Sequence, residues 1–321
     1  MGPTDAEQIL SILHAEGVPV SGVTRVSDSM FTGLLDGERR YLKRIPDDRA
    51  EVVQHLVEIQ DAIGMPPSQL IRTEENVQIM QPAGGKPLSY TLPLYTLPGI
   101  YGRYRHSLES GLRALGRYLG ELHTRTRNGD AIVHSSDLHF DKYRTITESG
   151  LNTQLEQELD AETVERYREL LDQYDSFTLP MSYVHGDVML FHVYYSDGNV
   201  ELIDFDRAAC ASIYTDLITF ECALELMLRR LPWGSESTFT QLISAFRAGY
   251  ADVQPEEIDY TAERYRFFKC LKYSSLFLYY MQAEGASSIL SSFNTSYITR
   301  HIDMRLLKKL IRETCNRASS H

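Results

Sequence analysis

The first eighty residues show one amphipathic helical pattern, followed by short runs in which apolar and polar positions alternate. Residues 4–16 carry Ile9, Leu10, Ile12 and Leu13 on one helical face. The alternating runs that follow are typical of half-buried strands and span residues 23–26, 31–35 and 40–45. Asp36-Gly37 between the last two runs is typical of a tight turn. The pattern predicts a helix and then three antiparallel strands.

A second helical pattern covers residues 49–63, and an apolar strand pattern follows at 77–80. Residues 81–85 then break the regularity with Pro and Gly, which favours a hinge at this place. We therefore expect an α+β protein with two parts. Residues 1–84 form a small antiparallel-sheet lobe, and residues 85–321 form a mainly helical lobe.

Most of the second part has helical periodicity, over residues 108–125 and from residue 216 onward. Residues 87–104 are different, because three prolines alternate with tyrosines there. Three prolines exclude one straight helix. This segment is either an aromatic lid over a substrate or an irregularly packed stretch.

The composition of the chain argues against some classes of binding partner. The chain has 321 residues, and its 32 basic against 44 acidic side chains give a net charge of −12. Such a balance argues against nucleic acid or an anionic membrane surface as the main partner. None of the four cysteines forms a Cys-x-x-Cys pair, no run of about eighteen apolar residues occurs, and the N-terminus is polar. We expect reduced thiols and a cytoplasmic protein without a membrane span.

Residues 183–206 carry the candidate chemistry. An apolar stretch ends at His185-Gly186, and Asp187 follows with a free carboxylate. His192 begins the next strand, residues 196–199 have the composition of a hairpin turn, and Asp204 ends the return strand. The hairpin brings His192 and Asp204 together with Asp187 facing them. One acid can then deprotonate a hydroxyl while two groups hold a metal ion.

The same residues also fit a simpler interpretation, a hairpin whose acids cap and turn the chain. This suffices for any single aspartate, but it does not explain why spacing, residue type and context agree. Asp206 either helps to hold the metal or caps the segment that follows. Asp216 lies near the start of a predicted helix, which it could cap.

His185-Gly186-Asp187, a ligand position at 192 and Ile203-Asp204 together resemble the aminoglycoside phosphotransferase / choline kinase family. The resemblance implies a bilobal protein-kinase-like fold with Asp187 as catalytic base and with Asp216 accepting hydrogen bonds from the backbone of the catalytic loop. It also implies that His192 and Asp204 hold Mg²⁺. The usual residue at 192 is Asn. An imidazole nitrogen is softer than an amide oxygen and suits Mn²⁺ or Zn²⁺ better than Mg²⁺.

The resemblance also assigns residues of the small lobe. Lys43 in the third strand steadies the ATP phosphates, and Glu58 in the following helix orients it. No Gly-rich fingerprint occurs, and a loop containing Ser27 and Ser29 stands in its place. The hinge backbone meets the adenine edge, at residues that include Gln81 and Ala83.

We therefore expect a phosphotransferase that moves the γ-phosphoryl group of ATP or GTP to a hydroxyl of a small molecule. One alternative is a kinase-like module that binds nucleotide without turning it over. Another is a metallohydrolase with His185, Asp187, His192 and Asp204 as metal ligands. The sequence does not identify the acceptor.

Overall fold

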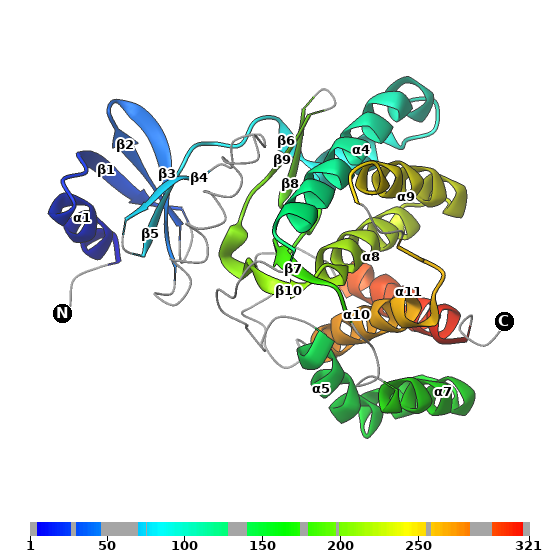
Figure 1. The fold of residues 1–321 in the computed structure, drawn as a ribbon. Coiled ribbons are helices and arrows are strands. Elements are labelled where there is room, and N and C mark those ends of the chain that lie inside the picture. The colour runs from blue at the N-terminus through cyan, green and yellow to red at the C-terminus, as the bar shows by residue number, and fades with distance from the viewer. Residues whose placement is uncertain are drawn as a thin grey trace.

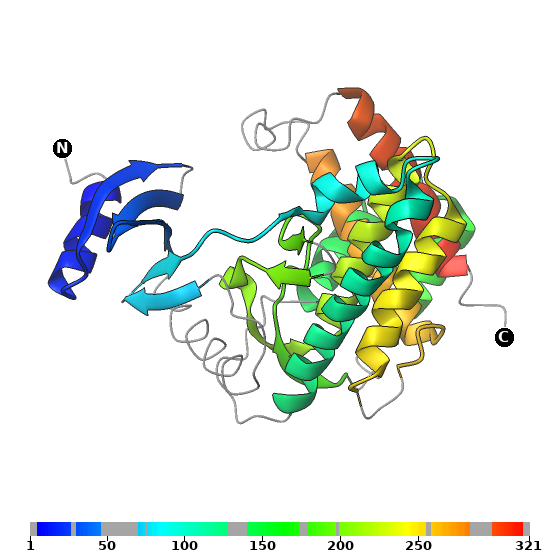
Figure 2. The same ribbon diagram turned by 90° about the horizontal axis from the view of Figure 1, so that it is seen from above.

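The computed structural model describes residues 5–26, 30–45, 70–74, 76–127, 140–173, 179–196, 199–254, 258–282 and 297–316. A small sheet lies at one end of the molecule and a larger helical body at the other, with a thin connection between them (Figures 1 and 2). The expected α+β architecture is therefore confirmed.

The smaller lobe is one helix packed on a five-stranded antiparallel sheet. These elements are α1 (Asp5–Ala15), β1 (Val20–Arg25), β2 (Met30–Leu35), β3 (Glu38–Arg44), β4 (Leu70–Glu74) and β5 (Val77–Met80). The strand order is β1-β2-β3-β5-β4. Asp36 and Gly37 have φ of 52° and 80°, so the predicted turn joins β2 to β3. The sequence pattern does not predict strand β4.

The larger lobe is built mainly of helices. They are α3 (Leu88–Tyr95), α4 (Tyr101–Arg125), α5 (Phe140–Leu151), α6 (Gln154–Glu158), α7 (Ala161–Asp172), α8 (Tyr214–Arg230), α9 (Glu236–Ala251), α10 (Glu263–Gln282) and α11 (Tyr297–Asn316). Helix α4 packs against α9, and α10 packs against both α5 and α11 (Figure 1). No helix in the described ranges is both long and apolar enough to cross a membrane.

Two small sheets cross the side of the larger lobe that faces the smaller one (Figure 1). Strands β6 (Lys86–Pro87), β8 (Val193–Ser196) and β9 (Asn199–Leu202) form one, and β7 (Met181–Val184) pairs with β10 (Ala209–Ser212) in the other. The β8–β9 pairing is antiparallel and ends at the pair Ser196 and Asn199, as the predicted hairpin requires. A short 3₁₀ turn, η2 (Phe205–Arg207), leads from β9 toward β10.

The expectation for residues 87–104 is correct in one respect and wrong in another. No single helix spans them, because the chain breaks between α3 and α4 around Pro98. The segment is nevertheless mostly helical, and Pro93 lies inside α3. Aromatic stacking holds α3 against the start of α4, since the rings of Tyr95 and Tyr104 stack with centroids 4.3 Å apart.

Each lobe has its own hydrophobic core. In the smaller lobe, Ile9 and Leu13 of α1 cover Phe31, Leu42 and Ile79 of the sheet, and all five are almost fully buried. The larger core gathers side chains from α3 to α11 together with the small sheets. The boundary after residue 84 stays a prediction.

Candidate active site

The loop from β7 to β8 holds Asp187, and its backbone shape demands glycine at position 186. Gly186 has φ of 81°, in the left-handed region that side chains disfavour. A Cβ atom there would also overlap the backbone oxygen of Arg207 in η2. The loop therefore lies directly against the turn that follows Asp204.

Asp216 in the first turn of α8 anchors this loop through hydrogen bonds to the loop backbone. Its Oδ2 accepts the backbone N–H of His185 at 2.8 Å, and its Oδ1 accepts that of Gly186 at 2.8 Å. The same Oδ2 lies 3.1 Å from Nε2 of His123, whose Nδ1 lies 2.9 Å from the Tyr250 hydroxyl. The carboxylate is fully buried, and these donors satisfy it. The predicted contact with the loop backbone is confirmed, and His123 is a packed residue.

His185 holds the loop and is not free to bind a metal. Its Nε2 lies 3.0 Å from the carbonyl oxygen of Ile203, so Nε2 carries the proton and donates. Its Nδ1 accepts the backbone N–H of Asp187 at 3.3 Å. Burial lowers the pKa of His185, which favours this neutral form. Because both ring nitrogens are engaged, the four ligands of the metallohydrolase alternative do not assemble.

Asp187, His192 and Asp204 lie together, as the hairpin geometry predicts. The Nδ1 of His192 donates to the backbone carbonyl of Asp187 at 2.8 Å and lies 3.7 Å from that residue's Oδ2. The Nε2 of His192 lies 3.4 Å from Oδ2 of Asp204. The Asp187 side chain is 20% exposed, so its carboxylate can reach an incoming molecule.

Lys43 reaches the same point from the smaller lobe. Its ammonium donates to Oδ1 of Asp204 at 2.7 Å, across 161 residues of sequence. Burial alone would raise the pKa of Asp204, but the charge and hydrogen bond of Lys43 outweigh burial and lower it. Asp204 itself has φ of 68° and ψ of 67°. This left-handed conformation is uncommon for a residue other than glycine and is typical of functional sites.

The geometry around Asp204 fits a metal ion in part. Nδ1 of His192 must carry a proton because its partner is a carbonyl, so in neutral histidine Nε2 presents a lone pair to a carboxylate oxygen. A cation bound between these two electron-rich atoms, which lie 3.4 Å apart, would be stabilised by both. Within the described ranges, however, no three His, Cys, Asp or Glu side chains converge closely enough to form a metal site by themselves.

A cavity of about 310 Å³ lies between the sheet of the smaller lobe and the β8–β9 hairpin. It is lined by Val26, Met30, Tyr41, Lys43, Met80, Gln81, Pro82, Ala83, Tyr194, Ile203 and Asp204. The predicted residues Lys43, Gln81, Ala83 and Asp204 thus share one cavity. Its charged end is the Lys43–Asp204 pair, and its other walls are largely apolar.

Several predicted residues cannot be placed. Ser27, Ser29 and Glu58 lie outside the described residues. The backbone of Asp206 belongs to η2, but its side chain also lies outside the described part.

The sequence does not indicate that Met30, Met80 and Tyr194 line the cavity, because single apolar residues on strands give no distinctive signal. It also gives no signal for Lys272 on α10, whose ammonium donates to the Tyr143 hydroxyl at 2.7 Å. Burial disfavours the charge on Lys272, but Tyr143 and Asp187 raise the pKa of that lysine.

Solved structures share this fold at low sequence identity. The amicoumacin kinase hAmiN, in complex with AMP-PNP, Ca²⁺ and Ami, matches with TM-score 0.64 at 13% identity, covering 97% of this chain and 94% of that one. The choline kinase LicA from Streptococcus pneumoniae matches with TM-score 0.56 at 12% identity, covering 97% and 100%. The ADP-bound aminoglycoside phosphotransferase APH(2'')-Ib matches with TM-score 0.52 at 13% identity, covering 97% and 99%.

These matches confirm the expected kinase-like fold. No curated protein matches the chain by sequence. A family model does: the one described as the phosphotransferase enzyme family matches residues 6–249. With the fold, the family model and the loop–hairpin geometry in agreement, the chain belongs to the phosphotransferase enzyme family.

Proposed function

We propose that the protein transfers the γ-phosphoryl group of ATP, or of GTP, to a hydroxyl group of a small molecule. One observation carries the proposal. Lys43 from the smaller lobe and Asp204 from the larger lobe meet at the end of an otherwise largely apolar cavity, with Asp187 and His192 beside them. Structural neighbours crystallised with AMP-PNP and ADP support nucleotide binding at such a site.

The walls of the cavity suit the base of a nucleotide. Met30, Met80 and Ile203 offer apolar surface to a flat base, and the backbone at Gln81 and Ala83 can hydrogen-bond the base edge. The triphosphate then points toward Lys43, whose ammonium leaves Asp204 to neutralise phosphate oxygens. Ser27, Ser29 and Glu58 remain proposed parts of this site.

Asp187 orients the acceptor hydroxyl and takes its proton as the oxygen attacks the γ-phosphorus. The bond from that phosphorus to the bridging oxygen breaks, and the nucleoside diphosphate leaves. His192 and Asp204 would hold Mg²⁺, or Mn²⁺ in view of the imidazole ligand, and Asp206 remains a candidate third group. Bound there, the ion would neutralise charge on the phosphates.

The acceptor approaches Asp187 from the larger lobe. The neighbours are named as kinases of amicoumacin, choline and aminoglycosides, which favours a small hydroxylated acceptor here.

A screen of hydroxylated metabolites and antibiotics with ATP and Mg²⁺ tests the proposal, with mass spectrometry detecting a phosphorylated product. The Asp187→Asn variant is the matched control. It should bind nucleotide normally and lose roughly 10²–10⁴ in turnover, the usual contribution of a general base. Near-normal turnover in this variant would refute the assignment of Asp187.

A further inference from the structure

A carboxylate of the β8–β9 hairpin holds the hinge, residues 81–85, that connects the two lobes. The backbone N–H of Gly84 donates to Oε2 of Glu201 on β9 at 2.9 Å, across 117 residues of sequence. A Cβ atom on Gly84 would lie 3.0 Å from Oε1 of the same carboxylate, so the Glu201 side chain packs directly against this glycine. Figure 1 shows the chain passing from β5 to β6 beside the hairpin. Glu201 therefore ties the hinge to the larger lobe.

The next residue of the hinge, Gly85, lies against the backbone of the same hairpin. It has φ of 77°, and a Cβ atom there would overlap the backbone oxygen of Tyr195 on β8. Strand β6, which follows at once, pairs with β8. Backbone contacts thus fix the chain from Gly85 onward. Glu201 extends this support by one residue, toward the part of the hinge that lines the cavity.

Glu201 lies beside the cavity in which we place the nucleotide. It stands directly opposite Tyr194 in the β8–β9 ladder, so the two side chains lie on the same face of the hairpin. Tyr194 lines the cavity, and so does Ala83, the residue bonded to the nitrogen of Gly84. Asp204 follows Glu201 by three residues, so their Cα atoms lie at most about 11 Å apart. One segment of chain thus supports both the hinge and the charged end of the cavity.

The hydrogen bond to Glu201 orients the whole peptide unit between Ala83 and Gly84. A trans peptide is planar, and its C=O and N–H groups point in opposite directions. Holding the N–H of Gly84 on Glu201 therefore also fixes the direction of the Ala83 carbonyl, an acceptor at the wall of the cavity. Adenine presents an amino donor where guanine presents a carbonyl acceptor. The orientation of one backbone peptide can therefore distinguish the two bases.

We propose that Glu201 is a positioning residue that sets the base preference of the nucleotide site by holding the Ala83–Gly84 peptide in one orientation. The inference rests on the proposed function, because it requires that a nucleotide binds in the cavity. Without the carboxylate, the N–H of Gly84 is released and the peptide no longer has one fixed orientation. Adenine and guanine nucleotides then bind with more nearly equal affinities.

Calorimetric titration of the full-length protein with AMP-PNP and, separately, with GMP-PNP, each with Mg²⁺, tests this role. The wild-type protein should bind one of the two more tightly. Glu201→Ala should weaken binding of that nucleotide about threefold to tenfold, the contribution of one hydrogen bond, and should reduce the ratio of the two affinities accordingly. Glu201→Gln keeps an acceptor oxygen for the Gly84 N–H and should retain the wild-type ratio. Glu121→Ala, which removes a surface carboxylate paired with Arg125, is the matched control.

The ratio of affinities separates positioning of the hinge from a general loss of structure, which would weaken both nucleotides alike. The inference is overturned if Glu201→Ala keeps the wild-type ratio, or if Glu201→Gln loses it as Glu201→Ala does. It is also overturned if the wild-type protein binds the two nucleotides equally. If the wild-type protein binds neither, the proposed function fails and this inference fails with it, so the two failures are distinguishable.

Discussion

Replacing Asp216 by asparagine should loosen the catalytic loop while leaving its residues in place. The carboxylate accepts three donors, two on Oδ2 from His185 and His123 and one on Oδ1 from Gly186. Asparagine has nearly the same shape but only one acceptor oxygen. If that oxygen keeps the two donors of Oδ2, the new amide group faces the Gly186 N–H, and two donors confront each other.

The magnitude follows from these contacts. A hydrogen bond to a charged group contributes about 1.5–3 kcal/mol, and a neutral one about 0.5–1.5 kcal/mol. The substitution abolishes one charged bond and converts two others to neutral ones, each at a loss of about 1 kcal/mol. Because Asp216 is fully buried, solvent does not screen the loss. The free energy of unfolding should fall by about 3–5 kcal/mol.

Urea denaturation of Asp216→Asn and wild type measures this change, and turnover measures the effect on the loop. Asp252→Asn is the matched control, since Asp252 pairs with Arg113 and Arg117 at the surface. The control should keep a midpoint close to that of wild type. If Asp216→Asn also keeps the wild-type midpoint and turnover, the carboxylate does not hold the loop.

Three further predictions concern the site and the thiols. Gly186→Ala should destabilise the protein by about 1–3 kcal/mol and displace Asp187, so turnover should fall more than nucleotide affinity; unchanged turnover would contradict the loop geometry. His192→Asn should stay active and shift metal preference toward Mg²⁺, and an unchanged metal profile would count against a ligand role. Burial raises the pKa of Cys222 to about 12, so at mildly alkaline pH a thiol reagent should react with the half-buried Cys210 before Cys222; equal rates in the folded protein would contradict this burial.

The hairpin that carries His192 and Asp204 could be predicted from sequence because its contacts are local. The strands pair over a tight turn, so alternation and turn composition suffice to bring the two residues together. The same locality explains the correct prediction of the turn at Asp36-Gly37. The contact of Asp216 with the loop was expected for another reason, because residues 214–217 at the start of the helix that follows the motif resemble the same family.

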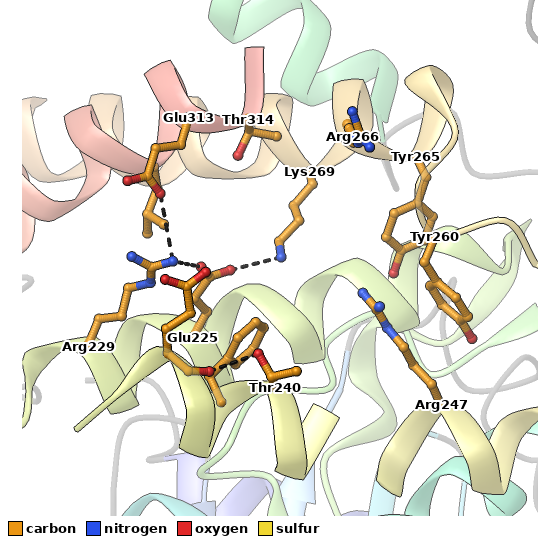
Figure 3. A pocket seen from close by; sticks show the side chains of 13 residues that line it. Glu225, Arg229, Thr240, Arg247, Tyr260, Tyr265, Arg266, Lys269, Glu313 and Thr314 are labelled. Atoms are coloured by element: carbon orange, nitrogen blue, oxygen red, sulfur yellow. Dashed lines mark hydrogen bonds and ion pairs between the residues drawn. The ribbon is translucent and has the colours of Figure 1, made fainter. Parts of the chain in front are cut away.

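Contacts between segments far apart in the sequence could not be predicted from local patterns. The Lys43–Asp204 pair joins positions 161 residues apart, and only the family resemblance indicated it. The sequence pattern predicts that helix α4 begins at residue 108, but it begins at Tyr101. Polar residues between these positions mask the helical periodicity, and the stacking of Tyr104 on Tyr95 has no signal in the sequence. The ion pairs that Arg247 and Lys269 make with Glu221 and Glu225 of α8 depend on how the helices pack, which periodicity does not determine (Figure 3 shows the contact between Lys269 and Glu225).

Calorimetric titration of the wild-type protein with AMP-PNP and Mg²⁺ tests most directly whether this cleft is a nucleotide site. We expect one binding site that Asp187→Asn retains and Asp204→Ala loses, since Asp204 belongs to the cavity and Asp187 acts on the acceptor. Equal affinity in Asp204→Ala and wild type, or no binding to the wild-type protein, would contradict it.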